Sequence, residues 1–206
     1  LYTRKRADYY RDCRLEFDER GRITTRIKHV RLLLMNTDGR IYLQKRSCGK
    51  GENPGLWDKS IEGHVPADSA FDTAMIRECA EELGFPAVIL RDTEYERALN
   101  SMHLEIIGVL QPIDIGTFQI SVRMTQDGSV LELPLMVATY VGYYNGHVKF
   151  VDGESSGLAV FSFDELKQEL AVHGALYTND LFTMAEEYGR WIKPLQIKSP
   201  LEGRIT

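Results

Sequence analysis

The stretch from residue 63 to residue 85, GHVPADSAFDTAMIRECAEELGF, constrains the fold more than any other part of the chain. Its pattern predicts an amphipathic helix with Ser69 as its N-cap, because serine side chains accept hydrogen bonds from the first backbone amides of a helix. The helix is expected to run to Leu83 and to stop at Gly84, since glycine favours the position after a helix end.

Three glutamates lie in the last two turns of this predicted helix. Side chains follow one another at about 100° around a helix, so Glu78, Glu81 and Glu82 share one face. A solvated charged face is the ordinary interpretation of such a pattern. However, the negative end of the helix dipole disfavours each carboxylate there by about 0.3–1 kcal/mol, and Arg77 offsets only part of this. A divalent cation would offset more of this unfavourable energy than Arg77 does.

Magnesium is the cation that this arrangement favours. It takes oxygen ligands and keeps several waters while it bridges to substrate phosphates. Two carboxylates can then hold the ion, and a third can orient or deprotonate a water that attacks the substrate. The acidic end of the helix is therefore a candidate catalytic centre.

The rest of the chain predicts a mixed sheet with helices on its faces, in a single domain over residues 25–206 preceded by an arm or short strand at residues 1–24. The Asp-Gly pair at residues 38–39, between two apolar runs, predicts a hairpin. Strands are expected at residues 29–36, 40–46, 56–65, 87–90, 102–110, 118–125 and 133–144. Helices are expected after a cap at Ser162 and after one at Thr178 or Asn179.

Charge and cysteine content narrow the functional classes. The net charge of −5 gives no basic surface for nucleic acid or for an acidic membrane, so neither is expected as a partner. The apolar runs are too short to cross a bilayer. The chain shows no signal-peptide pattern, and its three cysteines form no zinc or disulfide pattern, which favours a cytoplasmic, reducing setting.

The chain resembles the Nudix hydrolases, whose signature is G-x5-E-x7-R-E-U-x-E-E-x-G-U, with U a bulky aliphatic residue. The agreement covers Gly63, Arg77, Glu78, Glu81, Glu82, Gly84 and an apolar Phe85 at the right spacing. The resemblance implies an α/β/α sandwich around a mixed sheet. It also implies Mg²⁺ or Mn²⁺ bound by Glu81, Glu82, Glu78 and the Gly63 carbonyl, with Glu78 as catalytic base and Arg77 as its electrostatic partner.

Two positions depart from the signature. Ser69 replaces the first glutamate and removes a carboxylate from the metal neighbourhood, which neighbouring Asp68 could compensate. Cys79 replaces the aliphatic residue. A buried thiol packs as a small apolar group, so a core role for Cys79 is favoured over a catalytic one.

The similarity extends to one branch of this superfamily. The stretches HVRLLLMNTDGRIYLQKRS and NPGLWDKSIEGHV resemble isopentenyl diphosphate isomerase and related hydrolases. Isomerases of that branch carry a cysteine just before the Gly-His pair, where this chain has Glu62. We therefore expect a hydrolase that cleaves a diphosphate linkage in a nucleotide or other small molecule. The alternatives are an isomerase of prenyl diphosphates and a binding module without turnover.

Further residues are candidates around this centre. The resemblance suggests His64 and His29 for a second metal site, with Glu132, although each histidine alone is more often an ordinary packed or surface residue. Glu154 is a candidate remote ligand or base, and its surroundings also suit a plain turn. Three cations, Lys45, Arg46 and Lys59, are candidates for diphosphate binding or for a solvated strand edge.

The basic, aromatic arm around Tyr9 and Tyr10, which includes Arg4, Lys5, Arg6 and Arg11, is a candidate clasp for a second subunit in a homodimer.

Overall fold

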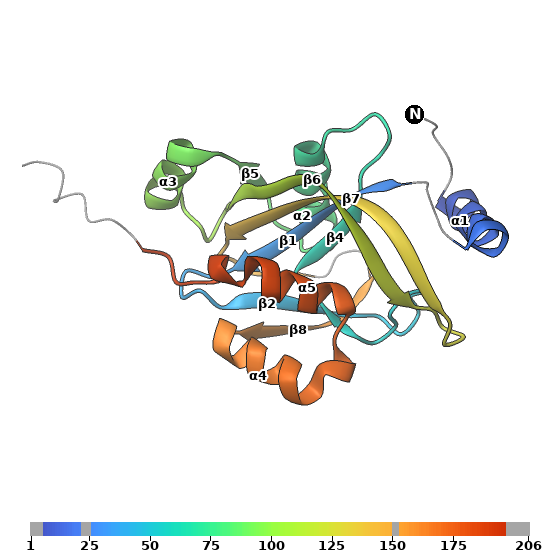
Figure 1. Cartoon of the computed structure of the whole chain (residues 1–206). Helices are drawn as coiled ribbons and strands as arrows, with labels where there is room; N and C mark the ends of the chain where they lie inside the picture. The colour runs from blue at the N-terminus through green and yellow to red at the C-terminus, as the bar shows by residue number, and fades with distance from the viewer. Residues whose placement is uncertain (1–5, 22–25, 150–152, 197–206) are drawn as a thin grey trace, which may run out of the picture.

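The computed structural model describes residues 6–21, 26–149 and 153–196. Its centre is an eight-stranded mixed sheet (Figure 1). The strand path is β3-β2-β1-β7-β6-β5, with β4 also paired to β1 and β8 to β2. The strands are β1 (Ile27–Met35), β2 (Ile41–Arg46), β3 (Trp57–Asp58), β4 (Ile61–His64), β5 (Ala87–Ile89), β6 (Gly108–Met124), β7 (Val130–Tyr143) and β8 (Ser155–Phe161).

The sheet combines parallel and antiparallel pairing. Strands β1 and β7 are parallel along the whole of β1, and β5 and β6 are parallel over three residue pairs. The other pairs are antiparallel, including the long β6–β7 hairpin. The helices are α1 (Arg6–Arg20), α2 (Phe71–Glu82), α3 (Asp92–Ser101), α4 (Phe163–His173) and α5 (Asn179–Tyr188), with 3₁₀ turns η1 (Gly174–Leu176) and η2 (Gly189–Trp191).

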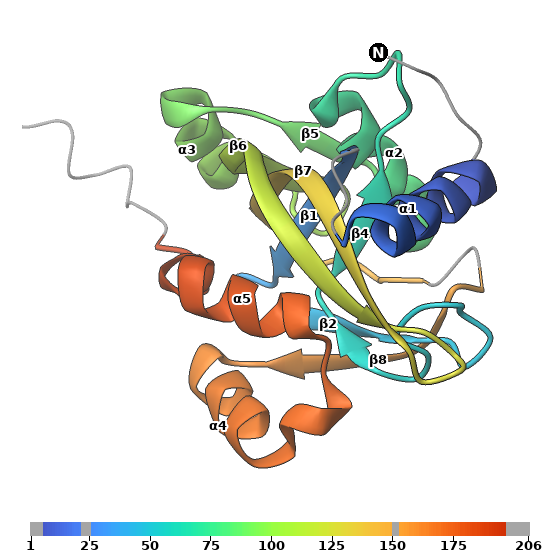
Figure 2. The same ribbon diagram turned by 45° about the vertical axis from the view of Figure 1, so that its right-hand side comes forward.

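Alternation along β1 divides the core into two layers. Leu33 and Met35 point to one face, where they pack with residues of α3, α4 and α5. Val30, Leu32 and Leu34 point to the other face and pack with α2. Successive side chains of a strand alternate between faces, so a fully buried run such as that in β1 requires cover on both sides. Figure 2 shows α4 and α5 on one side of the sheet and α2 on the other, which confirms the expected α/β/α sandwich.

Several predicted elements agree with the structure. The hairpin of β1 and β2 turns at Gly39, whose φ of 76° suits glycine. Helix α2 stops before Gly84, which has a φ of 70°. Helix α4 begins with the capping box of Ser162 and Glu165. The predicted cap at Ser69 is wrong, because Ala70 is the N-cap of α2 and no side chain caps it.

Other predictions are wrong. Residues 6–20 form a helix, where the sequence predicts an arm or a short strand, so the short-strand alternative does not hold for these residues. Tyr9 of this helix is buried against β7 of its own chain, so it is not available to clasp a second subunit. Arg4 and Lys5 of the predicted arm lie outside the described residues. Helix α3 occupies residues 92–101, and part of the strand expected at 102–110 is a turn that leads into β6.

Within the part of the chain that the structure describes, no helix is long and apolar enough to cross a membrane.

Candidate active site

A cavity of about 470 Å³ opens at the C-terminal end of α2. Its size is typical of small-molecule sites. The lining comes from α2, β1, β2, β4, β6 and two loops, and consists of His29, Gln44, Arg46, Lys50, Glu62, Gly63, His64, Arg77, Glu78, Glu81, Glu82, Arg123 and Glu154. The structure thus brings the predicted carboxylates of α2 together with cations from elsewhere in the chain.

Glu78 packs against β4 at Gly63. A Cβ atom added to Gly63 would lie 2.3 Å from the Glu78 Cδ, so only glycine permits this approach. Burial raises the pKa of Glu78, and the charges of Glu81 and Glu154 add to this, while the hydrogen bond from Arg77 opposes it. Arg77 donates from Nη2 to Glu78 Oε1 over 2.8 Å. Glu78 is therefore a buried carboxylate held in one orientation, with its proton affinity increased.

The other two glutamates differ in exposure. Glu82 is buried, with 7% of its surface exposed, and accepts a hydrogen bond from Gln44 Nε2 of β2 over 3.2 Å. Glu81 has a side chain that is 58% exposed and lies 3.4 Å from Arg77 Nε. The predicted acidic face of α2 is therefore partly directed into the protein, against β2 and β4, and only partly solvated.

The donor set suits a hard divalent cation. Gly63, Glu78, Glu81, Glu82 and Glu154 bring only oxygen donors to the cavity, which is the set that Mg²⁺ or Mn²⁺ prefers. Burial is the main cause of the raised pKa of Glu78, and the neighbouring carboxylates Glu81 and Glu154 contribute to it. Among the residues described, no three His, Cys, Asp or Glu side chains are already close enough to form a metal-binding group.

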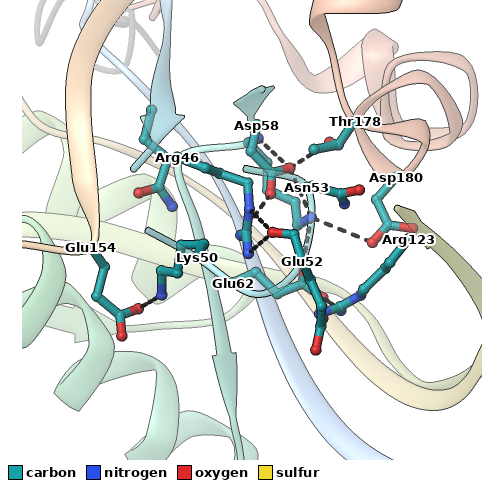
Figure 3. A network of polar contacts seen from close by, with 12 residues as sticks. Arg46, Lys50, Glu52, Asn53, Asp58, Glu62, Arg123, Glu154, Thr178 and Asp180 are labelled. Carbon is teal, nitrogen blue, oxygen red and sulfur yellow. Dashed lines mark hydrogen bonds and ion pairs between the residues drawn. The ribbon is translucent and has the colours of Figure 1, made fainter. Parts of the chain in front are cut away.

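The signature position taken by Ser69 contributes nothing to this cavity. Neither Ser69 nor Asp68 lines it, so Asp68 does not replace the missing glutamate here. Glu154 lines the cavity instead and pairs with Lys50, the contact labelled in Figure 3. The sequence signal for Glu154 was only its place in the chain, and Lys50 was missed because a single lysine in a glycine-rich loop has no distinctive pattern.

The three cations predicted to bind phosphate lie in different environments. Arg46 lines the cavity, although it also contacts Asp58 and the Glu52 carbonyl. Lys45 is outside the lining, with its Nζ 5.6 Å from the centre of the Trp57 ring. Lys59 does not line the cavity: it is fully buried and ion-paired with Asp58, Glu62 and Asp180.

A network of ionic residues, most of them buried, connects residues of the cavity lining with charged residues deeper in the protein (Figure 3). Glu62 of β4 is at its centre: it contacts Lys59, and its Oε1 lies 2.8 Å from Arg123 Nη2 and 3.3 Å from Arg31 Nη2. Burial by itself would raise the pKa of Glu62, but these three cations lower it well below its usual value. The network also includes Asp58, Asp180, Arg46 and Glu52.

The histidines lie beside this network. The rings of His29 and His64 have centroids 4.1 Å apart. Burial lowers the pKa of His29, which favours the neutral ring, and Nδ1 then donates to Glu62 Oε1 over 3.0 Å. Glu132, the third residue suggested for a second metal site, is exposed on β7 outside the cavity lining. The structure thus brings the two histidines together without Glu132.

Comparison with known proteins agrees with the sandwich fold. A family model described as "NUDIX domain" matches residues 25–181. The chain belongs to the Nudix family. An uncharacterised Nudix hydrolase of Pseudomonas aeruginosa is 35% identical over 79 residues, which cover 38% of this chain and 45% of that protein. An isopentenyl-diphosphate Delta-isomerase of Salmonella paratyphi B is 41% identical over 51 residues, 25% of this chain and 28% of the enzyme. The matches thus span less than half the length of these curated relatives.

Solved structures share the Nudix fold at low sequence identity. A Deinococcus radiodurans structure, DR0079, superposes with a TM-score of 0.56 at 19% identity, covering 78% of this chain and 82% of that one. A MutT protein of Methanosarcina mazei gives 0.54 at 20% identity, covering 82% and 96%. The Nudix domain of Shewanella oneidensis NrtR, solved with ADP ribose, gives 0.51 at 12% identity, covering 92% and 100%.

Proposed function

We propose that this Nudix protein is a metal-dependent hydrolase that cleaves a diphosphate linkage in a nucleotide or other small diphosphate compound. The observation that carries the proposal is the single cavity in which the carboxylates of α2 face cations from β2, β6 and the loop after β2. Such a cavity offers oxygen ligands for a cation and positive charge for phosphate oxygens, the two requirements of phosphate-ester hydrolysis.

Each residue has a defined task in this proposal. Glu81, Glu82, Glu78, the Gly63 carbonyl and Glu154 would hold Mg²⁺, which when bound supplies positive charge to the phosphate oxygens. Glu78 accepts the proton of the attacking water, because its carboxylate lines the cavity and is held in one orientation by the hydrogen bond from Arg77. Arg77 fixes the Glu78 carboxylate, and Lys50 and Arg46 contact the diphosphate.

The prenyl diphosphate isomerase alternative is disfavoured by the chemistry of Glu62. This residue occupies the position of the isomerase cysteine, but it is held ionised by three cations. A carboxylate with a strongly lowered pKa is a poor proton donor to carbon and cannot act as a thiol. His29 and Arg123 beside it also have ordered partners that a proton-transfer cycle would have to break.

The binding-module alternative is addressed by substitution of Glu82. Glu82→Gln keeps the shape of the side chain and its place beside Gln44 but removes the charge. The protein is to be tested with Mg²⁺ against a panel of nucleotide sugars, dinucleotides, nucleoside triphosphates and prenyl diphosphates, with the phosphate-containing products of each cleavage separated by anion-exchange chromatography as the readout. We expect turnover of one substrate class in the parent protein and a loss of about 100-fold or more in Glu82→Gln with the fold retained.

Glu94→Gln is the matched control, because Glu94 is an exposed glutamate of α3 outside the cavity. It should leave turnover unchanged. Binding of a diphosphate compound by the parent protein, without turnover of any panel member, would instead favour a binding module.

A further inference from the structure

The outer edge of β6 has a strand partner at only one end. Strand β6 spans Gly108–Met124, but β5 pairs only with its first three residues. Figure 2 shows β5 alongside this end of the long β6–β7 hairpin. Among the residues that the structure describes, no other strand pairs with the outer edge between the end of β5 and residue 122. This part of the sheet edge is therefore open.

The direction of the backbone groups along this edge follows from one contact near the hairpin turn. The Asn53 amide donates to the Met124 carbonyl over 2.7 Å, and the Met124 amide donates to Asn53 Oδ1 over 2.8 Å. Both backbone groups of Met124 thus point away from β7. The pattern repeats at every second residue of an antiparallel strand, and the pairing has no register shift over residues 118–124. Phe118, Ile120 and Val122 therefore present their backbone groups to solvent.

The open segment lacks the features that usually protect a sheet edge. Natural edges are blocked by charged side chains, prolines or β-bulges. On β6, Pro112 and both register shifts lie within residues 112–117. Residues 118–122, with the sequence FQISV, contain no charge, no proline and no register shift. This segment is therefore able to pair with a further strand.

An exposed apolar patch accompanies the open segment. Phe118, Ile120, Met124 and Val130 have between 47% and 66% of their surface exposed. Val130 lies opposite Met124 and on the same face of β7 as Tyr140, which packs in the layer of α2. The patch thus lies on the α2 face of the sheet, beyond the part that α2 covers. Exposed apolar patches of this kind mark interaction sites.

A second copy of the chain has the symmetry to cover this patch. When two identical strands pair antiparallel about a two-fold axis at Ile120, each Ile120 lies opposite the other. Phe118 of one copy then lies opposite Val122 of the second copy. All three residues direct their side chains to one face. The apolar side chains of the two copies would therefore meet in the same arrangement that joins their backbones.

Two charges beside the patch are complementary in this arrangement. The exposed Arg26 places its guanidinium carbon 4.5 Å from the centre of the Phe118 ring. The exposed Glu132 lies on β7 opposite Val122. Because Phe118 would face Val122 of the second copy, Arg26 would face Glu132 of that copy across two strand spacings, about 10 Å between backbones. Long side chains can span this distance, and the symmetry forms the contact twice. This complementarity favours a second copy over an unrelated strand.

We propose that two copies of this chain associate through the open edge of β6, with the two β6 strands antiparallel about a two-fold axis at Ile120. The sheet continues from one copy into the other, and the exposed Phe118 and Ile120 side chains become buried. The contact is small, so the dissociation constant falls in the micromolar range. The interface does not depend on the proposed hydrolase activity.

The first test measures the mass of the full chain by analytical ultracentrifugation from micromolar to millimolar concentration. We expect a monomer–dimer equilibrium in the parent. Ile120→Lys places two like charges opposite each other at the axis and should weaken association by about tenfold or more. Ile106→Lys is the matched control, because Ile106 is 67% exposed in the turn before β6 and lies outside the patch. It should associate as the parent does, and thermal unfolding checks that both variants are folded.

The second test exchanges the complementary charges. Arg26→Glu and Glu132→Arg each place like charges across the interface, so each variant alone should associate more weakly than the parent. An equimolar mixture of the two variants should recover the association of the parent, because opposite charges then meet at both contacts. Such recovery reports the register of the two strands as well as the presence of a dimer.

Three results would overturn the proposal: a monomer at every concentration, a dimer that Ile120→Lys does not weaken, or a mixture of the charge variants that associates no better than each variant alone. Glu82→Gln should dimerise as the parent does, because Glu82 lies in the diphosphate cavity and not at the edge of β6. Failure of the diphosphate proposal and failure of this one are therefore distinguishable.

Discussion

The contact between Gly63 and Glu78 provides a direct test of the candidate active site. In Gly63→Ala, the new methyl group would lie 2.3 Å from Glu78 Cδ, 2.4 Å from Cγ and 2.6 Å from Oε1. Carbon atoms that are not bonded pack at about 3.5–4.0 Å, so the Glu78 carboxylate must shift by more than about 1 Å.

This shift should reduce activity far more than stability. The atoms in conflict belong to the end of a flexible side chain, which can rotate away, and Gly63 does not have a positive φ that alanine would strain. However, a displacement of about 1 Å at a catalytic group costs about 100-fold in rate, equivalent to about 2.7 kcal/mol of transition-state stabilisation. We therefore expect a fall of about 100-fold in turnover and a weaker affinity for Mn²⁺.

The assay compares turnover, Mn²⁺ binding by calorimetry and thermal unfolding in the parent and in Gly63→Ala. Gly157→Ala is the matched control: Gly157 is also a strand glycine, but its added methyl group would approach no atom closer than 3.4 Å. Full activity and unchanged Mn²⁺ affinity in Gly63→Ala would refute the role that we assign to Glu78.

Two further predictions concern the buried ionic network. Lys59→Met should lower the free energy of unfolding by about 3–5 kcal/mol, because a fully buried cation that contacts Asp58, Glu62 and Asp180 is lost. Lys45→Met, on neighbouring β2, should cost less than about 1 kcal/mol in urea unfolding, and equal costs would contradict the network. Glu62 has a lowered pKa in the folded state, so its stabilisation is complete above the unfolded pKa of about 4.3 and is lost as pH falls through the folded value. The free energy of unfolding of the parent should therefore decline below about pH 4, and this decline should be smaller in Glu62→Gln. If the free energy of unfolding of Glu62→Gln fell with pH as steeply as that of the parent, Glu62 would not be the cause of the decline.

The fold could be predicted in outline where local signals are strong. The hairpin glycine, the capping box of Ser162 and the stop at Gly84 are local, and the structure contains all three. Helix α3 was missed because Arg91, its N-cap residue, makes no side-chain cap bond. The surroundings of Glu154 also suit a plain turn, but from Ser155 the chain forms β8, because this glycine-containing sequence pairs with β2.

The candidate site, like the fold, could be predicted from the sequence only in part. The sequence by itself determined that Glu78, Glu81 and Glu82 share one helix face, because helical periodicity is a property of neighbouring residues. It did not determine that Glu82 is buried against Gln44 while Glu81 is exposed, since this depends on how α2 packs on strands distant in the chain.

Only the tertiary structure decided which charges serve the cavity and which are internal. Lys45, Arg46 and Lys59 are equivalent in the sequence as cations that precede the helix, yet one lies over Trp57, one lines the cavity and one is fully buried. The environment of a charge is set by the strands and helices that pack around it, and for Lys59 these include Asp180, more than a hundred residues away. The residues that neighbour Lys59 in the sequence therefore do not identify Asp180 as its partner.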